Sequence, residues 1–281
     1  MSKQQNLKIL FLGDIVGAPG RRVVIRFLEL YKNYFDLIIA NAENCAHGFG
    51  LTKKNLDELK EAGVEIFSGG NHTFDRKEIF DFIETEPNLL RPANYPINTP
   101  GKGFTIVEVK GQRIGIINIL GRVFMEPLDS PFQVIDLILD QIKDQCDFII
   151  VDIHAEATAE KLALAHYLDG RVSAIVGSHT HVQTADERIL LKGTGYISDM
   201  GCCGPYNGVI GMAIKGVLLR MVRQLPSKFE IADGPAQMCG VEITLDLFDQ
   251  KCLAVKRVKF NEATIETDIH YFDQLYQNES N

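Results

Sequence analysis

The stretch Leu7-Lys8-Ile9-Leu10-Phe11-Leu12-Gly13-Asp14 sets the fold class of this chain. A short apolar run that closes on glycine and aspartate is typical of a buried strand that ends in a loop. The same pattern recurs along the first third of the chain, with strands predicted at 36–40 and 64–67 and helices at 21–34, 52–62 and 76–85. Alternating strands and helices of this kind predict an α/β fold with a parallel sheet and helices on its face.

The remainder of the chain changes character and adds a second group of strands. We predict hairpins at 104–119 and 240–260, helices at 131–144 and 156–168, strands at 148–153, 172–176, 188–191 and 195–198, and a loop at 225–234. Turn residues separate the strands of each hairpin. We expect a single domain over residues 1–281, with a polar and weakly patterned tail from about residue 262.

Five of the apolar runs end in residues that commonly bind metal ions. These are Asp14, Glu43-Asn44, Asn71-His72, His154 and His179-Thr180-His181. In open α/β sheets, ligands gather at the carboxyl ends of the strands, so the five segments are expected to meet at one edge. Carboxylate, amide and imidazole groups together form typical metal sites. The sequence therefore predicts a metal centre.

Each segment also has a plainer interpretation when it is taken alone. Asp14 could be a turn or N-cap residue, Glu43 a solvated loop residue and Asn71 an ordinary turn residue. In an extended segment, His179 and His181 would present both imidazoles on the same side. Glu43 suits a bridging role because its two oxygens can bind two cations about 3.5–4 Å apart.

Three other histidines lie outside these predicted ligand segments. His47 lies in the glycine-containing loop 46–50, where it is a candidate substrate contact, with plain loop surface as the alternative. His166 and His270 have helical or polar surroundings, and we assign them structural roles.

Composition limits the classes of function. The chain has 281 residues, 46% of them hydrophobic, which is enough for a large core. A formal charge of −8 opposes binding to duplex DNA, although bound metal ions would still attract a nucleotide phosphate. Six cysteines without a CxxC pair predict reduced thiols in a cytoplasmic protein. We expect no signal peptide and no membrane segment.

Four motifs carry a resemblance to a known family. They are Gly-Asp-Ile-Val-Gly at 13–17, Asn-Ala-Glu-Asn at 41–44, Gly-Gly-Asn-His-Thr-Phe-Asp at 69–75 and Gly-Ser-His-Thr-His-Val-Gln-Thr at 177–184. In order and spacing the chain resembles the calcineurin-like metallophosphoesterase superfamily and its bacterial YmdB-like branch, from Lys8 to about Met212. The resemblance implies the four-layer α/β/β/α sandwich of that superfamily.

The resemblance also implies two metal ions with Glu43 as their bridge. One ion would be bound by Asp14, Glu43, Asn44 and His181, and the other by Glu43, Asn71, His154 and His179. His72 would be the catalytic acid or phosphate contact, free of the metals. The chain departs from the broad superfamily pattern at Ile15-Val16, where Asp-x-His is usual, and at Glu43, where aspartate is usual. The ions would be divalent or trivalent, with iron or manganese preferred and zinc as the alternative.

The activity implied by the resemblance is hydrolysis of cyclic nucleotides, above all 2′,3′-cyclic nucleoside monophosphates. A metal-bridging hydroxide would attack phosphorus in line. Three alternatives remain: a phosphomonoesterase or nucleotidase that uses the same centre, a regulator that acts through RNA or protein binding, and a structural metal site. The sequence also leaves room for a homo-oligomer.

Overall fold

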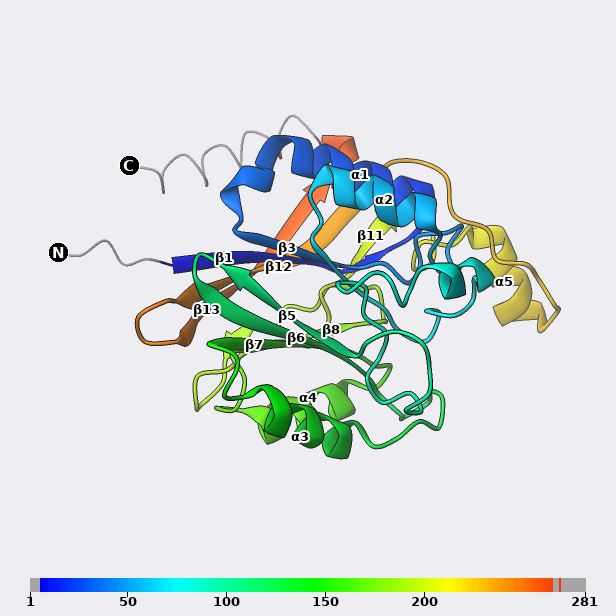
Figure 1. Ribbon diagram of the computed structural model, residues 1–281. Coiled ribbons are helices and arrows are strands. Elements are labelled where there is room, and N and C mark those ends of the chain that lie inside the picture. The colour runs from blue at the N-terminus through cyan, green and yellow to red at the C-terminus, as the bar shows by residue number, and fades with distance from the viewer. Residues whose placement is uncertain (1–5, 265–267, 269–281) are drawn as a thin grey trace.

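The computed structural model describes residues 6–264 and 268, and it has four layers. Figure 1 shows α1 (Gly17–Tyr31) and α2 (Lys53–Ala62) over one sheet, and α3 (Pro131–Ile142) and α4 (Thr158–Leu168) under a second sheet. The two sheets pack face to face between these helices. The predicted α/β/β/α sandwich is therefore confirmed.

The first sheet has seven strands and begins with the predicted parallel unit. β1 (Asn6–Leu12) pairs in parallel with β3 (Leu37–Asn41), and β3 pairs in parallel with β4 (Ile66–Ser68). On the other side of β1 lies β12 (Ala236–Asp246), which is antiparallel to both β1 and β13 (Lys251–Asn261). The short strands β11 (Cys202–Pro205) and β2 (Asp14–Ile15) follow beyond β12. The closing hairpin of β12 and β13 is confirmed, and β12 begins four residues before the predicted start.

The second sheet has six strands in the order β5-β6-β7-β8-β10-β9. They are β5 (Phe104–Val109), β6 (Gln112–Leu120), β7 (Phe148–His154), β8 (Ala174–Ser178), β9 (Arg188–Ile189) and β10 (Gly195–Ile197). β6, β7 and β8 are parallel, so their carboxyl ends meet at the same edge. The hairpin of β5 and β6 confirms the prediction for 104–119.

The helices follow the sequence pattern with two exceptions. Thr52 caps α2 as predicted, because its Oγ1 accepts a hydrogen bond from the Asn55 backbone N at 3.3 Å. The prediction of an α-helix at 76–85 is wrong. Only the 3₁₀ helix η2 (Lys77–Asp81) forms there, since backbone N–H groups such as those of Ile79 and Phe82 bond three residues back. The other 3₁₀ helices are η1 (Lys32–Tyr34) and η3 (Glu262–Thr264).

One helix, α5 (Ile214–Arg223), was not predicted. Its apolar residues Ile214, Val217, Leu218 and Met221 follow the i, i+3, i+4, i+7 spacing of an amphipathic helix, which is the pattern that could have revealed it. The segment 225–230 that follows has no helix or strand, as predicted for this loop.

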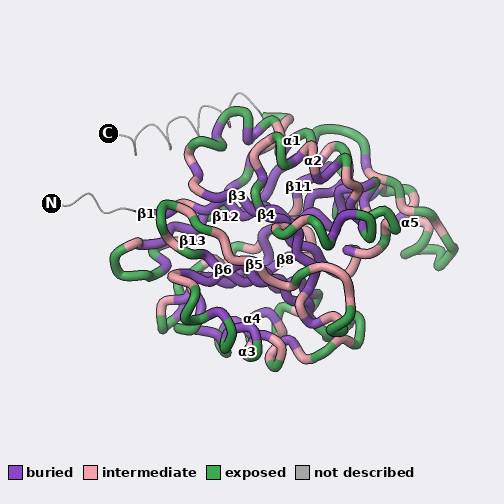
Figure 2. Tube along the Cα trace, in the orientation of Figure 1, coloured by how far each residue is buried: buried purple, intermediate pink, exposed green. Residues whose placement is uncertain are grey.

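The core is divided among the layers. Figure 2 shows the buried residues concentrated in the strands and on the inner faces of the helices. Between the sheets, residues such as Phe11, Ile150, Val176 and Ile243 are fully buried. None of the helices in the described part of the chain is long and apolar enough to cross a membrane.

All six cysteines are free, in keeping with the prediction of reduced thiols. Other expectations are not tested by the fold. The single-domain interpretation, the cytoplasmic location and the homo-oligomer stay predictions. His270 and most of the predicted tail lie outside the described residues, and His166 is exposed on α4.

Candidate metal centre

The five predicted ligand segments all lie at the carboxyl ends of strands. Asp14 follows β1 closely, Glu43-Asn44 follows β3 and Asn71-His72 follows β4. His154 is the last residue of β7, and His179-Thr180-His181 follows β8. The fold therefore brings residues that are up to 167 positions apart in the chain to one edge, through strand direction within each sheet and the packing of the two sheets.

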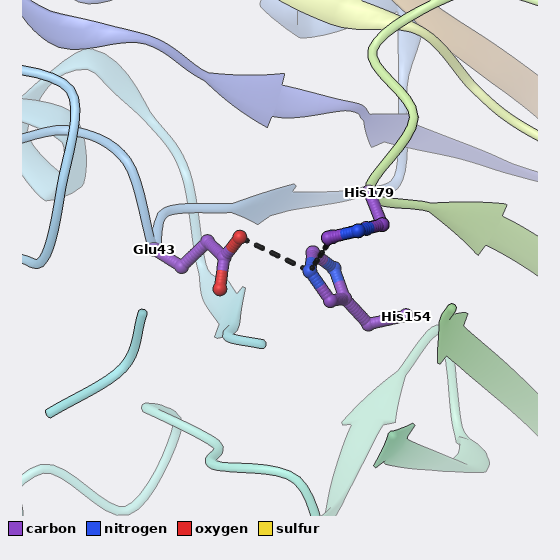
Figure 3. A group of neighbouring side chains, drawn as sticks. All are labelled: Glu43, His154 and His179. Carbon is purple, nitrogen blue, oxygen red and sulfur yellow. Dashed lines mark hydrogen bonds and ion pairs between the residues drawn. The ribbon is translucent and has the colours of Figure 1, made fainter. Parts of the chain in front are cut away.

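His154 is the centre of the first half of the site. Its Nε2 lies 3.1 Å from Glu43 Oε1, 3.0 Å from Asn71 Oδ1 and 3.0 Å from His179 Nδ1. Figure 3 shows Glu43 and His179 both directed at the His154 ring. One ligand atom from each of Glu43, His154 and His179 lies within 4.8 Å of the others, close enough to surround a single cation.

Asp14, Asn44 and His181 form the second half. Asp14 Oδ1 lies 3.8 Å from His181 Nε2 and also 3.8 Å from His154 Nδ1. The Asn44 amide nitrogen donates to Glu43 Oε1 at 3.1 Å, which joins the two halves. Among the described residues, Asp14 Oδ1 and Asn44 Oδ1 are buried oxygens without a hydrogen-bond donor. Such oxygens are costly unless a cation binds them, so the residues present fit a metal ion.

The electrostatics of the site also call for a cation. Burial would raise the pKa of Glu43, but the facing His154 lowers that pKa to about 2. Burial would lower the pKa of His154, but the Glu43 carboxylate raises that pKa to about 9. Burial raises the pKa of Asp14, with His181 and His154 opposing it. The surrounding acceptors therefore favour positive charge beside His154, which a proton or a metal ion can supply.

A chain of hydrogen bonds behind His154 fixes which nitrogen faces the site. Ser178 Oγ donates to Asp152 Oδ1 at 2.7 Å, so it accepts from His154 Nδ1–H at 3.0 Å. Ser68 Oγ donates to the other oxygen of Asp152 at 2.5 Å. Burial raises the pKa of Asp152 to about 6. In the neutral ring, Nε2 then keeps its lone pair for a cation in the site.

The segment that carries the last two histidines is not extended, in contrast to the expectation. His179 has φ = 99° and His181 has φ = 64°, both in the left-handed region that side chains other than glycine rarely adopt. Asp14 Oδ2 accepts from the His179 backbone N at 3.1 Å, and Asp199 Oδ2 accepts from the Thr180 backbone N at 3.0 Å. These bonds hold a tight turn. The pKa of His179 is lowered to about 3, mainly by burial and also by the neighbouring His154, so that imidazole stays neutral.

A buried ion pair beneath this turn was missed from the sequence. Lys161 Nζ lies 2.9 Å from Asp199 Oδ2 and donates to the Ser178 carbonyl oxygen at 2.7 Å. Both side chains are at most 1% exposed. The available signal was a lysine on the same helical face as Leu164, Ala165 and Leu168. A buried charge of this kind requires a partner.

His72 lies beside the cluster rather than in it. Its backbone N donates to Glu43 Oε2 at 2.9 Å, and its ring Nδ1 lies 2.8 Å from Asp75 Oδ2. The ring lines a pocket of about 400 Å³ together with Glu43, His179 and His181. His47 is exposed and does not line this pocket, although Gly48 and Phe49 do. A role for His47 in substrate binding stays a prediction.

The two-layered sheet core and this cluster define a protein of the metallophosphoesterase type. The family model described as "YmdB-like protein" matches residues 10–258, and the chain belongs to this family. It is 47% identical over 260 residues to the 2′,3′-cyclic-nucleotide 2′-phosphodiesterase of Bacillus subtilis, across 91% of this chain and 98% of that protein.

Solved structures agree with this assignment. A crystal structure described as a novel phosphatase from Mycoplasma pneumoniae superimposes with a TM-score of 0.87 at 36% identity, over 92% of this chain and 94% of that one. A 5′-nucleotidase precursor from Thermus thermophilus shares only 15% identity, with a TM-score of 0.52 over 98% of this chain and 59% of that one. The latter likeness concerns the fold alone.

Proposed function

We propose that this chain is a dinuclear-metal phosphodiesterase that hydrolyses 2′,3′-cyclic nucleoside monophosphates. The observation that carries the proposal is the convergence of Glu43, His154 and His179 within 4.8 Å of one another, beside a pocket large enough for a small ligand. The name of the Bacillus subtilis relative, a 2′,3′-cyclic-nucleotide 2′-phosphodiesterase, supports the choice of substrate.

Seven side chains would hold the two ions. Glu43 would bridge them. Asp14 Oδ1 and Asn44 Oδ1, which are buried and have no hydrogen-bond donor, would each bind a cation. The other ligands would be Asn71, His154, His179 and His181. This mixture of nitrogen and oxygen donors suits manganese, iron or zinc. When bound, the ions would supply Lewis-acid activation of water and offset the charge that grows on the phosphoryl oxygens.

His72 would complete the reaction as the proton donor. Water adds to phosphorus, the bond from phosphorus to the 2′ oxygen breaks, and the departing oxygen needs a proton to become a hydroxyl. The His72 ring lines the pocket, and its Nδ1 lies 2.8 Å from Asp75 Oδ2, so Asp75 would orient the ring and leave Nε2 to donate the proton. The His72 backbone meanwhile holds Glu43 in place.

The test is a substrate panel. Protein reconstituted separately with Mn²⁺, Fe²⁺ or Zn²⁺ is given 2′,3′-cyclic nucleotides, 3′,5′-cyclic nucleotides and linear nucleoside monophosphates, and products are separated by chromatography. We expect 2′,3′-cyclic substrates to give the 3′-phosphate with the highest kcat/KM. Faster turnover of linear monophosphates would instead favour the phosphatase alternative, to which the name of the Mycoplasma relative points.

A further inference from the structure

One side of the pocket is apolar, and the metal chemistry leaves it without a role. We call this side the apolar wall, and it consists of Phe49, Ile210, Met212, Val217, Met221 and Phe229. The rest of the lining carries the ionisable and polar groups, among them Glu43, Glu156 and the histidines. A pocket with one charged side and one apolar side fits a ligand that is itself anionic at one end and apolar at the other.

The apolar wall begins directly at the catalytic groups. The Phe49 ring lies edge-on to the His72 ring, with 4.8 Å between centroids. The Ile210 carbonyl oxygen lies 3.0 Å from His181 Nδ1, so it can accept a hydrogen bond from that ring. A substrate whose phosphate lies between His72 and His181 can therefore place its next group against these residues.

The wall is partly anchored and partly open. Met212 and Val217 are buried and pack with Val16 in a small apolar cluster. Met221, on α5, is 66% exposed although it lines the pocket, so its side chain is available to a ligand. The Arg220 guanidinium lies over the Phe229 ring at 5.1 Å, which helps to hold that ring in position.

We infer that the apolar wall is the binding site for the nucleobase of the substrate. This inference rests on the proposed function and specifies how the same site selects its substrate. Aromatic rings stack on the flat face of any base, and methionine side chains adapt to different shapes. No side chain of the wall offers an N–H or O–H group or a carboxylate. The wall therefore recognises that a base is present and does not distinguish one base from another.

The first experiment compares substrates that share the reacting ring. The Mn²⁺-loaded protein is given the four common 2′,3′-cyclic nucleotides and methyl riboside 2′,3′-cyclic phosphate, which has no base. We expect kcat/KM for the four nucleotides to agree within about tenfold. We expect kcat/KM for the compound without a base to be about 5- to 150-fold lower, as the loss of one stacked base implies.

The second experiment removes the wall. Met221→Ala and Phe229→Ala should each reduce the ratio of kcat/KM for nucleotide to that for the compound without a base. Leu218→Ala is the matched control, because Leu218 lies on the same helix, is 49% exposed and does not line the pocket. The exposed position of Met221 keeps the test valid even if Phe229→Ala fails to fold.

Four results would overturn the inference. Equal kcat/KM with and without a base would show that the wall binds no base, while the proposed phosphodiesterase activity would stand. A full nucleotide preference in both folded wall variants would place the base elsewhere, and a preference above about tenfold among the four bases would contradict recognition by packing. Turnover of none of the five cyclic phosphates would instead refute the proposed function, and the inference with it.

Discussion

Replacing Asp199 by asparagine should destabilise the protein and weaken its hold on metal, although Asp199 is not one of the proposed ligands. Asp199 Oδ2 accepts from Lys161 Nζ at 2.9 Å, from the Thr180 backbone N at 3.0 Å and from Thr180 Oγ1 at 2.7 Å. Its Oδ1 accepts from the Gly201 backbone N at 2.8 Å. The carboxylate thus neutralises a fully buried lysine and also holds the turn that carries His179 and His181.

The magnitude follows from the burial of the pair. Removing one partner of a buried ion pair leaves an uncompensated charge, which costs about 3–5 kcal/mol. In Asp199→Asn the Lys161 ammonium would keep its hydrogen bond to the Ser178 carbonyl oxygen but lose the carboxylate that compensates its charge. Lys161→Met leaves the Asp199 carboxylate with the donors of Thr180 and Gly201, so we expect a smaller loss of about 1.5–3 kcal/mol. The double variant should be more stable than Asp199→Asn alone, because neither charge of the buried pair remains.

Urea unfolding of the four proteins at one fixed metal concentration measures these differences, and elemental analysis counts bound metal. Asp136→Asn serves as the control, because it breaks the surface pair with Arg171 at 2.6 Å, with both side chains about 40% exposed. Its loss should be about 0–1 kcal/mol. An Asp199→Asn protein that unfolds at the wild-type urea concentration and keeps its full metal content would refute the reasoning.

Three further predictions concern the centre itself. Glu43→Gln should lower kcat/KM by more than about 100-fold with the fold intact, because even outer-shell residues of metal sites contribute about 10- to 100-fold. Undiminished turnover by a folded, metal-loaded variant would reject the bridging role. His72→Ala should keep its metal but lose about 10²–10⁴-fold in rate, and less with a nitrophenyl leaving group, which needs little protonation; loss of a metal equivalent would make His72 a ligand. Chelation should lower the Tm of the wild-type protein, since saturation at about 100 times Kd contributes about 2.7 kcal/mol, and an unchanged Tm would count against metal binding by Asp14 and Glu43.

The strands of the fold could be predicted because their apolar runs are short and end sharply. β1 is followed at once by Gly13, and β3 and β4 end at Asn41 and Ser68, so both the strand and its loop are visible in the sequence. The segment around η2 failed because Ile79, Phe82 and Ile83 have helical spacing and are buried, yet most of its backbone bonds span only three residues. Spacing of apolar residues cannot separate these two hydrogen-bond patterns.

The ligand residues could be predicted for a different reason, which is that charged and polar residues directly after buried strands are conspicuous. The residues that hold these ligands in position could not be predicted. Ser68 and Ser178 lie 110 residues apart and meet only because both contact Asp152. Lys161, on α4, meets Asp199, which lies in the loop after β10. Contacts of this kind depend on how strands and helices pack. The local sequence does not indicate which serine will face inward, and the apolar face that Lys161 shares with Leu164 indicates its burial but not its partner.

The arrangement of the proposed ligands links the metal centre to the packing of the two sheets. The ligands with oxygen donors, Asp14, Glu43, Asn44 and Asn71, all follow strands of the first sheet. The ligands with nitrogen donors, His154, His179 and His181, all follow or end strands of the second sheet. Each proposed ion would therefore be bound from both sheets at once. A metal ion held in this way stabilises only the state in which the sheets are docked, so its binding free energy is added to that of the apolar core between them. The same geometry explains why the turn after β8 needs the buried Lys161–Asp199 pair beneath it: an error in that turn would displace two ligands of the second sheet relative to all four of the first.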